Sequence, residues 1–394
     1  MAGVGGSSIG VRILLLLVFL PSIPILVVGG FYQPLRLDFL LMSALAAVYL
    51  LSIIKSLRIS RYTLFFLLVG SFYIFNSSSR FVGLVQIFGY LSLFASFKIG
   101  SKAVRSEGNA RILAKYLTVA VYAALTIHIL GLLGISFDMY VGGAKYTVFG
   151  KYATFGMPFK FGLFLISVLF LIRAGIITSG KLMTLMLIIS VLTCDSRISA
   201  VCVVLVVAFI FTNAASNIIF ISTLLAVIAS PKIVAMFSGL GEIQDDTSLA
   251  MRLVNLDNYV EWLDTYSLLL GHGALAFLEF GQAYGAPGPI DILSVRLFSE
   301  FGVPLSVIAF IVFACILRLV TETRVFLAFI ICFVFYGFFN EGVVSLRSGN
   351  FYWFSFGTLY GQWKVRRFAQ RKAGKIAFQP FSWVSVGGHQ SFKQ

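Results

Sequence analysis

The run Leu182-Met-Thr-Leu-Met-Leu-Ile-Ile-Ser-Val-Leu-Thr193 contains no charged residue, and its apolar positions are continuous rather than alternating. A strand of a transmembrane barrel alternates between apolar and polar positions, so this run favours a helix with apolar surroundings on all sides. Similar runs follow one another along the chain, which predicts about twelve helical spans. They lie near residues 11–30, 38–54, 62–75, 81–97, 116–136, 159–177, 182–194, 199–212, 216–230, 294–317, 325–340 and 351–364.

The composition of the whole chain agrees with this interpretation. Of its 394 residues, 59% are hydrophobic and only 11% are charged, and the mean hydropathy is +0.97. A soluble domain contains far more charge, so a soluble enzyme is excluded. We expect an all-α, polytopic integral membrane protein with a single transmembrane domain over residues 1–394, because each crossing takes about 20 apolar residues.

The charges indicate which way the chain is oriented. The formal net charge is +15. If the N-terminus is cytoplasmic, most Lys and Arg fall in the inner connections, together with only Glu107 and Glu322 of the 15 acidic residues. This asymmetry follows the positive-inside rule and predicts two cytoplasmic termini, with residues 365–394 as a cytoplasmic tail. Basic residues beside an anionic leaflet need no nucleic acid to explain them.

Cysteine and histidine patterns give no support for a metal site or a cofactor. The four cysteines lie in or beside apolar runs without CxxC spacing, and the three histidines form no HExxH motif. We therefore expect neither a bound metal nor a cofactor.

Two outer connections are long, residues 137–158 and above all the large periplasmic loop 231–293. From Thr247 onward, apolar residues recur with helical spacing, which predicts an amphipathic helix within this loop. A neighbouring face of that helix carries Arg252, Asn255, Tyr259 and Trp262. Either the aromatic residues mark the level of the lipid headgroups, or the face forms a wall for a sugar chain and a phosphate.

Several arginines lie on the predicted outer side, against the usual charge distribution. An arginine at a membrane boundary is costly unless it is paired or used, and its planar guanidinium suits phosphate oxygens. For Arg197 two interpretations stay open, a phosphate or sugar contact and an ion pair with an acid such as Asp195. Arg296 and Glu300 are spaced i,i+4, which also allows a structural ion pair. The outer arginines are Arg80, Arg197, Arg252, Arg296 and Arg347.

Three residues are candidates for a proton acceptor. Asp291 follows Pro289-Ile290 and is either a helix N-cap or a base. His272 lies between two glycines and is either a plain loop residue or a proton acceptor. Glu300 is a second carboxylate that could accept the proton. The spacing alone does not choose among them.

These motifs together resemble the bacterial O-antigen and polysaccharide polymerases of the Wzy type. The resemblance covers chiefly residues 190–320 and is carried by topology and loop position as much as by residue identity. The related O-antigen ligases look similar but often have His-Asn where this chain has Ile290-Asp291, which favours a polymerase. The matching segments are Ser196-Arg197, Asp246-Thr-Ser-Leu-Ala-Met-Arg252, Leu269-Leu-Gly-His-Gly273, Ile290-Asp291 and Leu297-Phe-Ser-Glu-Phe-Gly302.

The resemblance implies a metal-independent, inverting glycosyltransferase in the bacterial inner membrane, acting in lipopolysaccharide or polysaccharide biosynthesis. Such enzymes join undecaprenyl-diphosphate-linked repeat units at the periplasmic face and release undecaprenyl diphosphate, and a chain-length regulator is an implied partner. Arg197 and Arg252 would then stabilise the departing diphosphate. The supporting substrate contacts would come from Arg80, Arg296, Asn255, Tyr259 and Trp262, and the base from Asp291, Glu300 or His272.

Two other functions suit about twelve spans. An O-antigen ligase would transfer finished polymer to a lipid A core, and a flippase or other transporter would move lipid-linked oligosaccharides across the bilayer. A transporter usually carries charged residues near the middle of its spans. In this chain nearly all charges lie at the ends of the apolar runs, which favours chemistry at the membrane surface.

Overall fold

The computed structural model describes about three fifths of the chain in continuous segments and a few further residues. The segments are 35–56, 61–77, 80–104, 107–141, 144–155, 157–177, 180–211, 265–273, 293–321, 323–339 and 348–372, with residues 12, 16, 18, 19, 24–26, 262 and 276 in addition.

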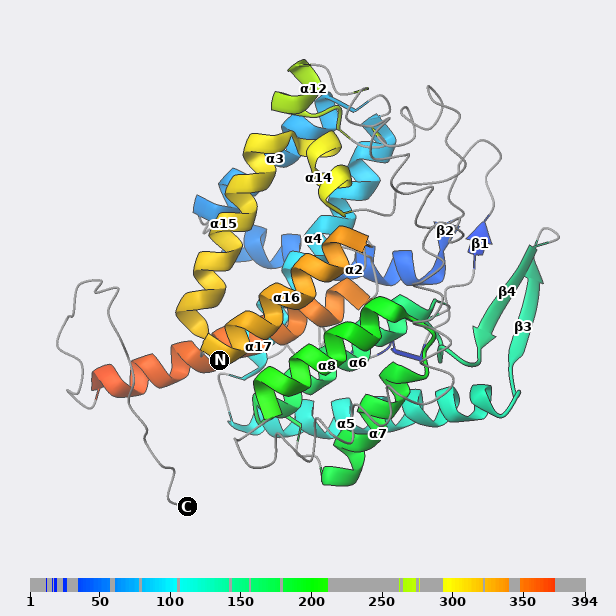
Figure 1. Cartoon of the computed structure of the whole chain (residues 1–394). Coiled ribbons are helices and arrows are strands. Elements are labelled where there is room, and N and C mark those ends of the chain that lie inside the picture. Colours follow the sequence, from blue (N-terminus) through cyan, green and yellow to red (C-terminus); the bar gives the residue numbers. More distant parts are fainter. Residues whose placement is uncertain are drawn as a thin grey trace.

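The described residues are mostly helical, as the continuous apolar runs predict (Figure 1). Ten predicted runs, from 38–54 to 199–212 and from 294–317 to 351–364, coincide largely with helices. Run 216–230 lies outside the described residues. The helices are α2 (Leu37–Ser56), α3 (Arg61–Phe75), α4 (Arg80–Ala103), α5 (Glu107–Leu132), α6 (Pro158–Arg173), α7 (Lys181–Leu192), α8 (Arg197–Phe211), α12 (Thr265–Leu270), α14 (Leu293–Phe301), α15 (Val303–Val320), α16 (Thr323–Phe339) and α17 (Ser348–Lys372).

Two short antiparallel hairpins add strands to the predicted all-α fold. Strands β1 (Pro24–Leu26) and β2 (Leu35–Arg36) pair with each other, so the predicted run 11–30 contains a strand. Strands β3 (Phe137–Val141) and β4 (Ala144–Phe149) form a second hairpin within the connection 137–158. Aromatic and β-branched residues in β3 and β4 favour extended backbone, which gives this connection a defined structure.

The predicted run 294–317 is two helices rather than one. Gly302 separates α14 from α15 with a φ of +78°, a conformation that an L side chain rarely adopts. Pro304 then lies in the first turn of α15, where its missing N–H costs no helical hydrogen bond. The chain therefore changes direction at Gly302.

Helices α4 and α17 pack closely because small residues face each other. An added Cβ on Gly100 would collide with the Phe354 carbonyl oxygen, and one on Gly357 would collide with the Phe97 carbonyl oxygen. Small residues spaced by four allow two helix backbones to approach in this way. The pairing of Gly361 with Ser101 extends the contact along both helices in parallel.

At one end of the fold, the last turns of two helices carry basic residues. The Gln362 side chain of α17 donates a hydrogen bond of 2.6 Å to the Ala174 carbonyl oxygen, just after α6, and Gly361 contacts the end of α4. We call this the basic end, since the last turns of α4 and α6 carry Lys102 and Arg173. In Figure 1 the end of α17 lies at the left, whereas both hairpins lie at the right. Helix α17 also continues to Lys372, within the predicted tail 365–394.

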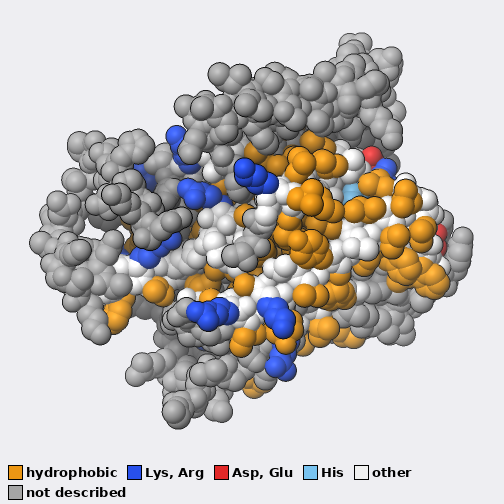
Figure 2. All heavy atoms as spheres, turned by 90° about the horizontal axis from the view of Figure 1, so that it is seen from below, with side chains coloured by type: hydrophobic (Ala, Val, Ile, Leu, Met, Phe, Trp, Pro, Cys, Tyr) orange, Lys and Arg blue, Asp and Glu red, His pale blue; other side chains and the backbone are white. Residues whose placement is uncertain are grey.

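One face of the molecule exposes large hydrophobic side chains. In Figure 2, seen from below, hydrophobic side chains cover much of the right half and most Lys and Arg lie in the left half. On α5 the exposed residues Ile112, Tyr116, Val119 and Tyr122 follow one helical stripe. Within the described part of the chain, Ala110–Leu132 is the one helix long and apolar enough to cross a membrane by itself, and the other apolar helices, such as Val303–Leu319, are shorter.

Candidate functional site

A buried carboxylate, Glu300, lies at the end of α14 and is 1% exposed. Its Oε1 accepts a hydrogen bond of 3.0 Å from Arg296 Nε, one helical turn earlier. Its Oε2 accepts one of 2.7 Å from the Tyr90 hydroxyl of α4. The Tyr73 hydroxyl of α3 lies 3.1 Å from the same oxygen and also contacts Gln86. We call Glu300, Arg296, Tyr73 and Tyr90 the Glu300 network.

Arg296 and Glu300 thus form the structural ion pair that their i,i+4 spacing allows. Both oxygens of this carboxylate are already occupied by a guanidinium and two hydroxyls, which leaves little room for a substrate hydroxyl to approach them. Glu300 instead fixes the direction of the planar Arg296 guanidinium, which carries five donors in all. The Glu300 network is therefore better suited to holding a cation in place than to removing a proton.

The Gly271-His272-Gly273 segment after α12 packs directly on this end of α14. The His272 amide donates a 2.6 Å hydrogen bond to the Ser299 carbonyl, and the Gly273 amide donates one of 3.1 Å to the Glu300 carbonyl. Both glycines have positive φ, and an added Cβ on either would collide with neighbouring backbone. The backbone position of His272 is therefore fixed closely against the Glu300 network.

Two further predicted residues lie in this region. The rings of Trp262 and His272 are 4.9 Å apart, which brings an aromatic face to the imidazole. Arg80 begins α4 only three residues after Ser77, which Gly273 contacts, and its guanidinium lies 5.9 Å from the centre of the Phe75 ring. The structure thus gathers five of the predicted site residues at one end of the fold: Arg80, Trp262, His272, Arg296 and Glu300.

Arg197 lies at a different corner of the molecule. It is the first residue of α8, and its side chain lies outside the described residues. The preceding Asp195 has a φ of +56°, forms an ion pair with Lys151 and accepts a 3.1 Å hydrogen bond from the Tyr152 hydroxyl. Partial burial and the Asp195 carboxylate raise the pKa of Tyr152 to about 12, so this hydroxyl remains a donor at neutral pH.

His128 connects the same corner to the bundle. It is fully buried, with Nδ1 against the Lys151 carbonyl oxygen and Nε2 3.0 Å from the Thr193 hydroxyl. Both ring nitrogens therefore have partners, as expected of a packing residue. The turn that leads into Arg197 is held by Lys151, Tyr152 and His128 together.

The remaining predicted site residues fall outside the part of the chain that the structure describes. These are Arg252, Asn255, Tyr259 and Asp291, and with them most of the predicted amphipathic helix.

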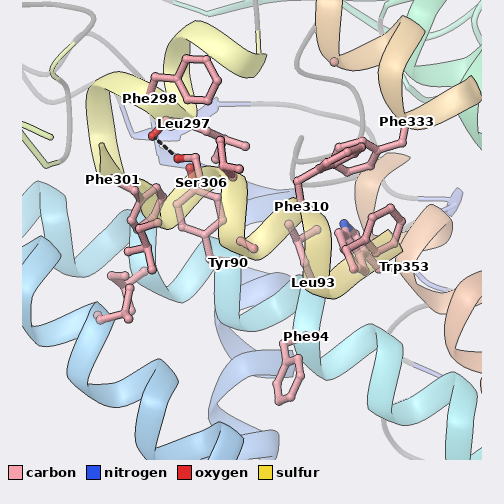
Figure 3. A pocket seen from close by; sticks show the side chains of 18 of the residues that line it. Tyr90, Leu93, Phe94, Leu297, Phe298, Phe301, Ser306, Phe310, Phe333 and Trp353 are labelled. Carbon is pink, nitrogen blue, oxygen red and sulfur yellow. Dashed lines mark hydrogen bonds between the residues drawn. The ribbon is translucent and has the colours of Figure 1, made fainter. Parts of the chain in front are cut away.

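An apolar pocket of about 530 Å³ adjoins the Glu300 network. Figure 3 shows Tyr90 and Phe301 at one end of the pocket and Phe310, Phe333 and Trp353 at the other. Ser306 donates a 2.9 Å hydrogen bond to the Leu297 carbonyl oxygen, which joins α15 to α14 beside the pocket. Its lining is Val69, Gly70, Ile87, Tyr90, Leu93, Phe94, Leu297, Phe298, Phe301, Leu305, Ser306, Val307, Ala309, Phe310, Phe313, Phe333, Val334, Gly337 and Trp353.

Sequence reasoning missed the two tyrosines of the Glu300 network and the pocket beside it. The signal in the sequence is weak, since it consists only of the hydroxyl groups that Tyr73 and Tyr90 carry within two successive apolar runs. A tyrosine there indicates a buried hydrogen-bond partner without naming it.

The described residues contain no group of three or more His, Cys, Asp or Glu side chains that could hold a metal ion. Comparisons of the chain with protein-family models, with curated proteins and with solved structures give no match.

Proposed function

We propose that this protein is a polysaccharide polymerase of the O-antigen type, which joins undecaprenyl-diphosphate-linked repeat units at the periplasmic face of the bacterial inner membrane. The observation that carries the proposal is the Glu300 network beside the apolar pocket, since the two share Tyr90 as a common wall. A lipid-linked glycan needs both parts, an apolar site for its chain and a held cation near its diphosphate.

A multi-span arrangement of about twelve helices, with both termini on the cytoplasmic side, agrees with the surface and the charges. Exposed residues such as Leu51, Leu133 and Leu182, which are 64%, 72% and 71% exposed, are costly in water and suited to lipid. The basic end carries Lys102 and Arg173 and would face the cytoplasm. The Glu300 network lies at the opposite end.

The proposed reaction is an inverting displacement at the anomeric carbon of the growing chain. A hydroxyl of the incoming repeat unit forms the new C–O bond, the bond to the lipid diphosphate breaks, and the hydroxyl proton passes to a base. Arg252 would stabilise the diphosphate as its charge develops, with Arg296 and Arg80, which the fold gathers at one end, in support. Arg197, at a different corner of the molecule, would contact the diphosphate of the second lipid-linked substrate. His272 or Asp291 is the better candidate for the base, since Glu300 is already engaged by Arg296.

The test is the length profile of surface and lipid-linked glycans in cells that lack the gene. Loss of the long ladder, with single repeat units left on the core, supports polymerisation as the missing step. Long polymer that accumulates on the lipid carrier indicates a ligase instead. Repeat units that accumulate facing the cytoplasm indicate a flippase.

Variants then address the arginines. Arg197→Ala and Arg252→Ala should each shorten or abolish the ladder when immunoblots show normal insertion. Lys115→Ala is the matched control, because Lys115 is an exposed cation near the start of α5, on the proposed cytoplasmic side. Unchanged polymer length in both arginine variants contradicts the proposed roles.

A further inference from the structure

We infer that the apolar pocket seats the hydrocarbon chain of a polyprenyl-type lipid, which enters sideways from the bilayer between α15 and α16. The inference rests on the proposed function for its choice of lipid, and on the pocket itself for everything else. A hydrocarbon chain is suited to such a site within a membrane, because the lining has no charged side chain and only a few polar atoms.

The pocket opens on the outer surface of the helix bundle. Three lining residues, Val307, Phe310 and Val334, are also 42%, 37% and 42% exposed. They lie on α15 and α16, and their neighbours Ile308 and Ile311 are exposed apolar residues as well. A ligand therefore reaches the pocket along an apolar surface, which favours a molecule already dissolved in the bilayer.

The pocket is elongated along the helices. Its lining on α15 extends from Leu305 to Phe313, about 12 Å at a rise of 1.5 Å per residue, and on α4 from Ile87 to Phe94, about 10 Å. One leaflet contributes about 15 Å to a hydrocarbon core of about 30 Å. The pocket thus matches the depth of most of one leaflet, the one nearer the Glu300 network.

The two ends of the pocket differ in polarity, which orients the lipid. The ring of Tyr90 lines the pocket, and its hydroxyl donates a hydrogen bond to Glu300. Because Glu300 also binds Arg296, this end of the pocket adjoins the Arg296 guanidinium. The other end is closed by Phe313, Phe333 and Trp353. An anionic headgroup is therefore directed toward the cation, and the tail toward the aromatic end.

Aromatic rings dominate the lining and favour a branched, unsaturated chain over a straight acyl chain. Flat ring faces offer broad contact to methyl branches and double bonds, whereas a straight chain fills a narrow channel more completely. The aromatic residues are Tyr90, Phe94, Phe298, Phe301, Phe310, Phe313, Phe333 and Trp353.

The test uses the purified full-length protein and a polyprenyl diphosphate with a diazirine on its chain. After irradiation, peptides of α4, α14, α15 or α16 should carry the label. Ala309→Trp should reduce that labelling at least fivefold, since Ala309 lines the pocket at its exposed side. Leu319→Trp is the matched control, because Leu319 is exposed near the far end of the same helix and is not among the lining residues.

A second variant fills the pocket from the opposite wall. A Cβ on Gly70 of α3 would meet Ile87 Cδ1 at an ordinary 3.5 Å, so Gly70→Leu should fold and should also reduce labelling. Equal labelling of the wild type and both pocket variants overturns the inference. It is also overturned if a diacyl phospholipid competes with the labelled probe as well as an unlabelled polyprenyl diphosphate does, because the pocket would then take any membrane lipid.

The labelling result is independent of the polymerase assay. Pocket labelling that is lost in Ala309→Trp supports the inference even if the protein makes no polymer, a case in which only the proposed function fails. Normal polymer synthesis by a folded Ala309→Trp variant overturns the inference and leaves the proposed function standing.

Discussion

The Glu300 carboxylate is a buried charge that a guanidinium and two hydroxyl groups hold in place. Removal of one partner from such a pair leaves the other charge buried without compensation, at a cost of about 3 kcal/mol or more. Glu300→Gln should therefore lower the thermal unfolding midpoint of the detergent-solubilised protein by several degrees. A midpoint equal to that of the wild type would show that the pair contributes little.

A paired replacement separates stability from function at this position. Arg296→Met combined with Glu300→Leu removes both charges, and such swaps are often neutral or stabilising. We expect the double variant to recover most of the unfolding midpoint that Glu300→Gln loses, but not to recover polymer synthesis. Recovery of both would assign the pair to packing alone.

Asp195 allows a test of backbone conformation at a single residue. Its ion pair with Lys151 is partly exposed on both sides, with side chains 49% and 39% exposed, and such pairs contribute about 1 kcal/mol at most. Its φ of +56° costs an L residue roughly 1–2 kcal/mol and costs glycine almost nothing.

We therefore expect Asp195→Gly to stay within about 1 kcal/mol of the wild type, because the two effects oppose each other. Asp195→Val loses the pair and retains the strained backbone, so it should be less stable than the glycine variant by about 2 kcal/mol. Denaturant unfolding of both variants measures the difference. Equal stabilities would argue against strain at this turn.

At the scale of elements, the contact between α4 and α17 depends on glycine. A side chain at Gly357 would meet the backbone of Phe97 rather than a flexible side chain, so the helices must separate to admit it. Gly357→Leu should destabilise the protein by about 3 kcal/mol, the upper range for overpacking, and reduce its amount in membranes. Gly70→Ala is the control, because an added Cβ there has ordinary contact distances.

Sequence patterns explain most helices but not their interruptions. The helical runs are visible because each depends on residues a few positions apart. The β3–β4 hairpin has a local signal in the sequence, Gly142-Gly143 between two runs rich in aromatic and β-branched residues. Gly302 and Pro304 likewise marked the break between α14 and α15 within an apolar run.

For the whole molecule, the proposed topology predicts which surfaces are accessible from outside the cell. Thr147→Cys, on the exposed part of β4, should react with a membrane-impermeant thiol reagent in spheroplasts. Arg366→Cys, on the exposed end of α17, should react only after the membrane is permeabilised. The wild type measures background from the exposed Cys315. Reaction of Arg366→Cys in intact spheroplasts would reverse the orientation.

The apolar runs, the helical class and the uneven charge follow from composition and from spacings of a few residues, so they can be derived without coordinates. The site follows from contacts between distant residues. Glu300 meets Tyr73 and Tyr90 across 227 and 210 positions of the chain, and 16 tyrosines were available to serve as its donors. A buried carboxylate requires donors, but which hydroxyls reach it depends on how α3, α4 and α14 pack. The pocket also depends on tertiary packing, because its walls come from six helices. The apolar faces of these helices look alike in the sequence, and only their packing decides where a gap remains.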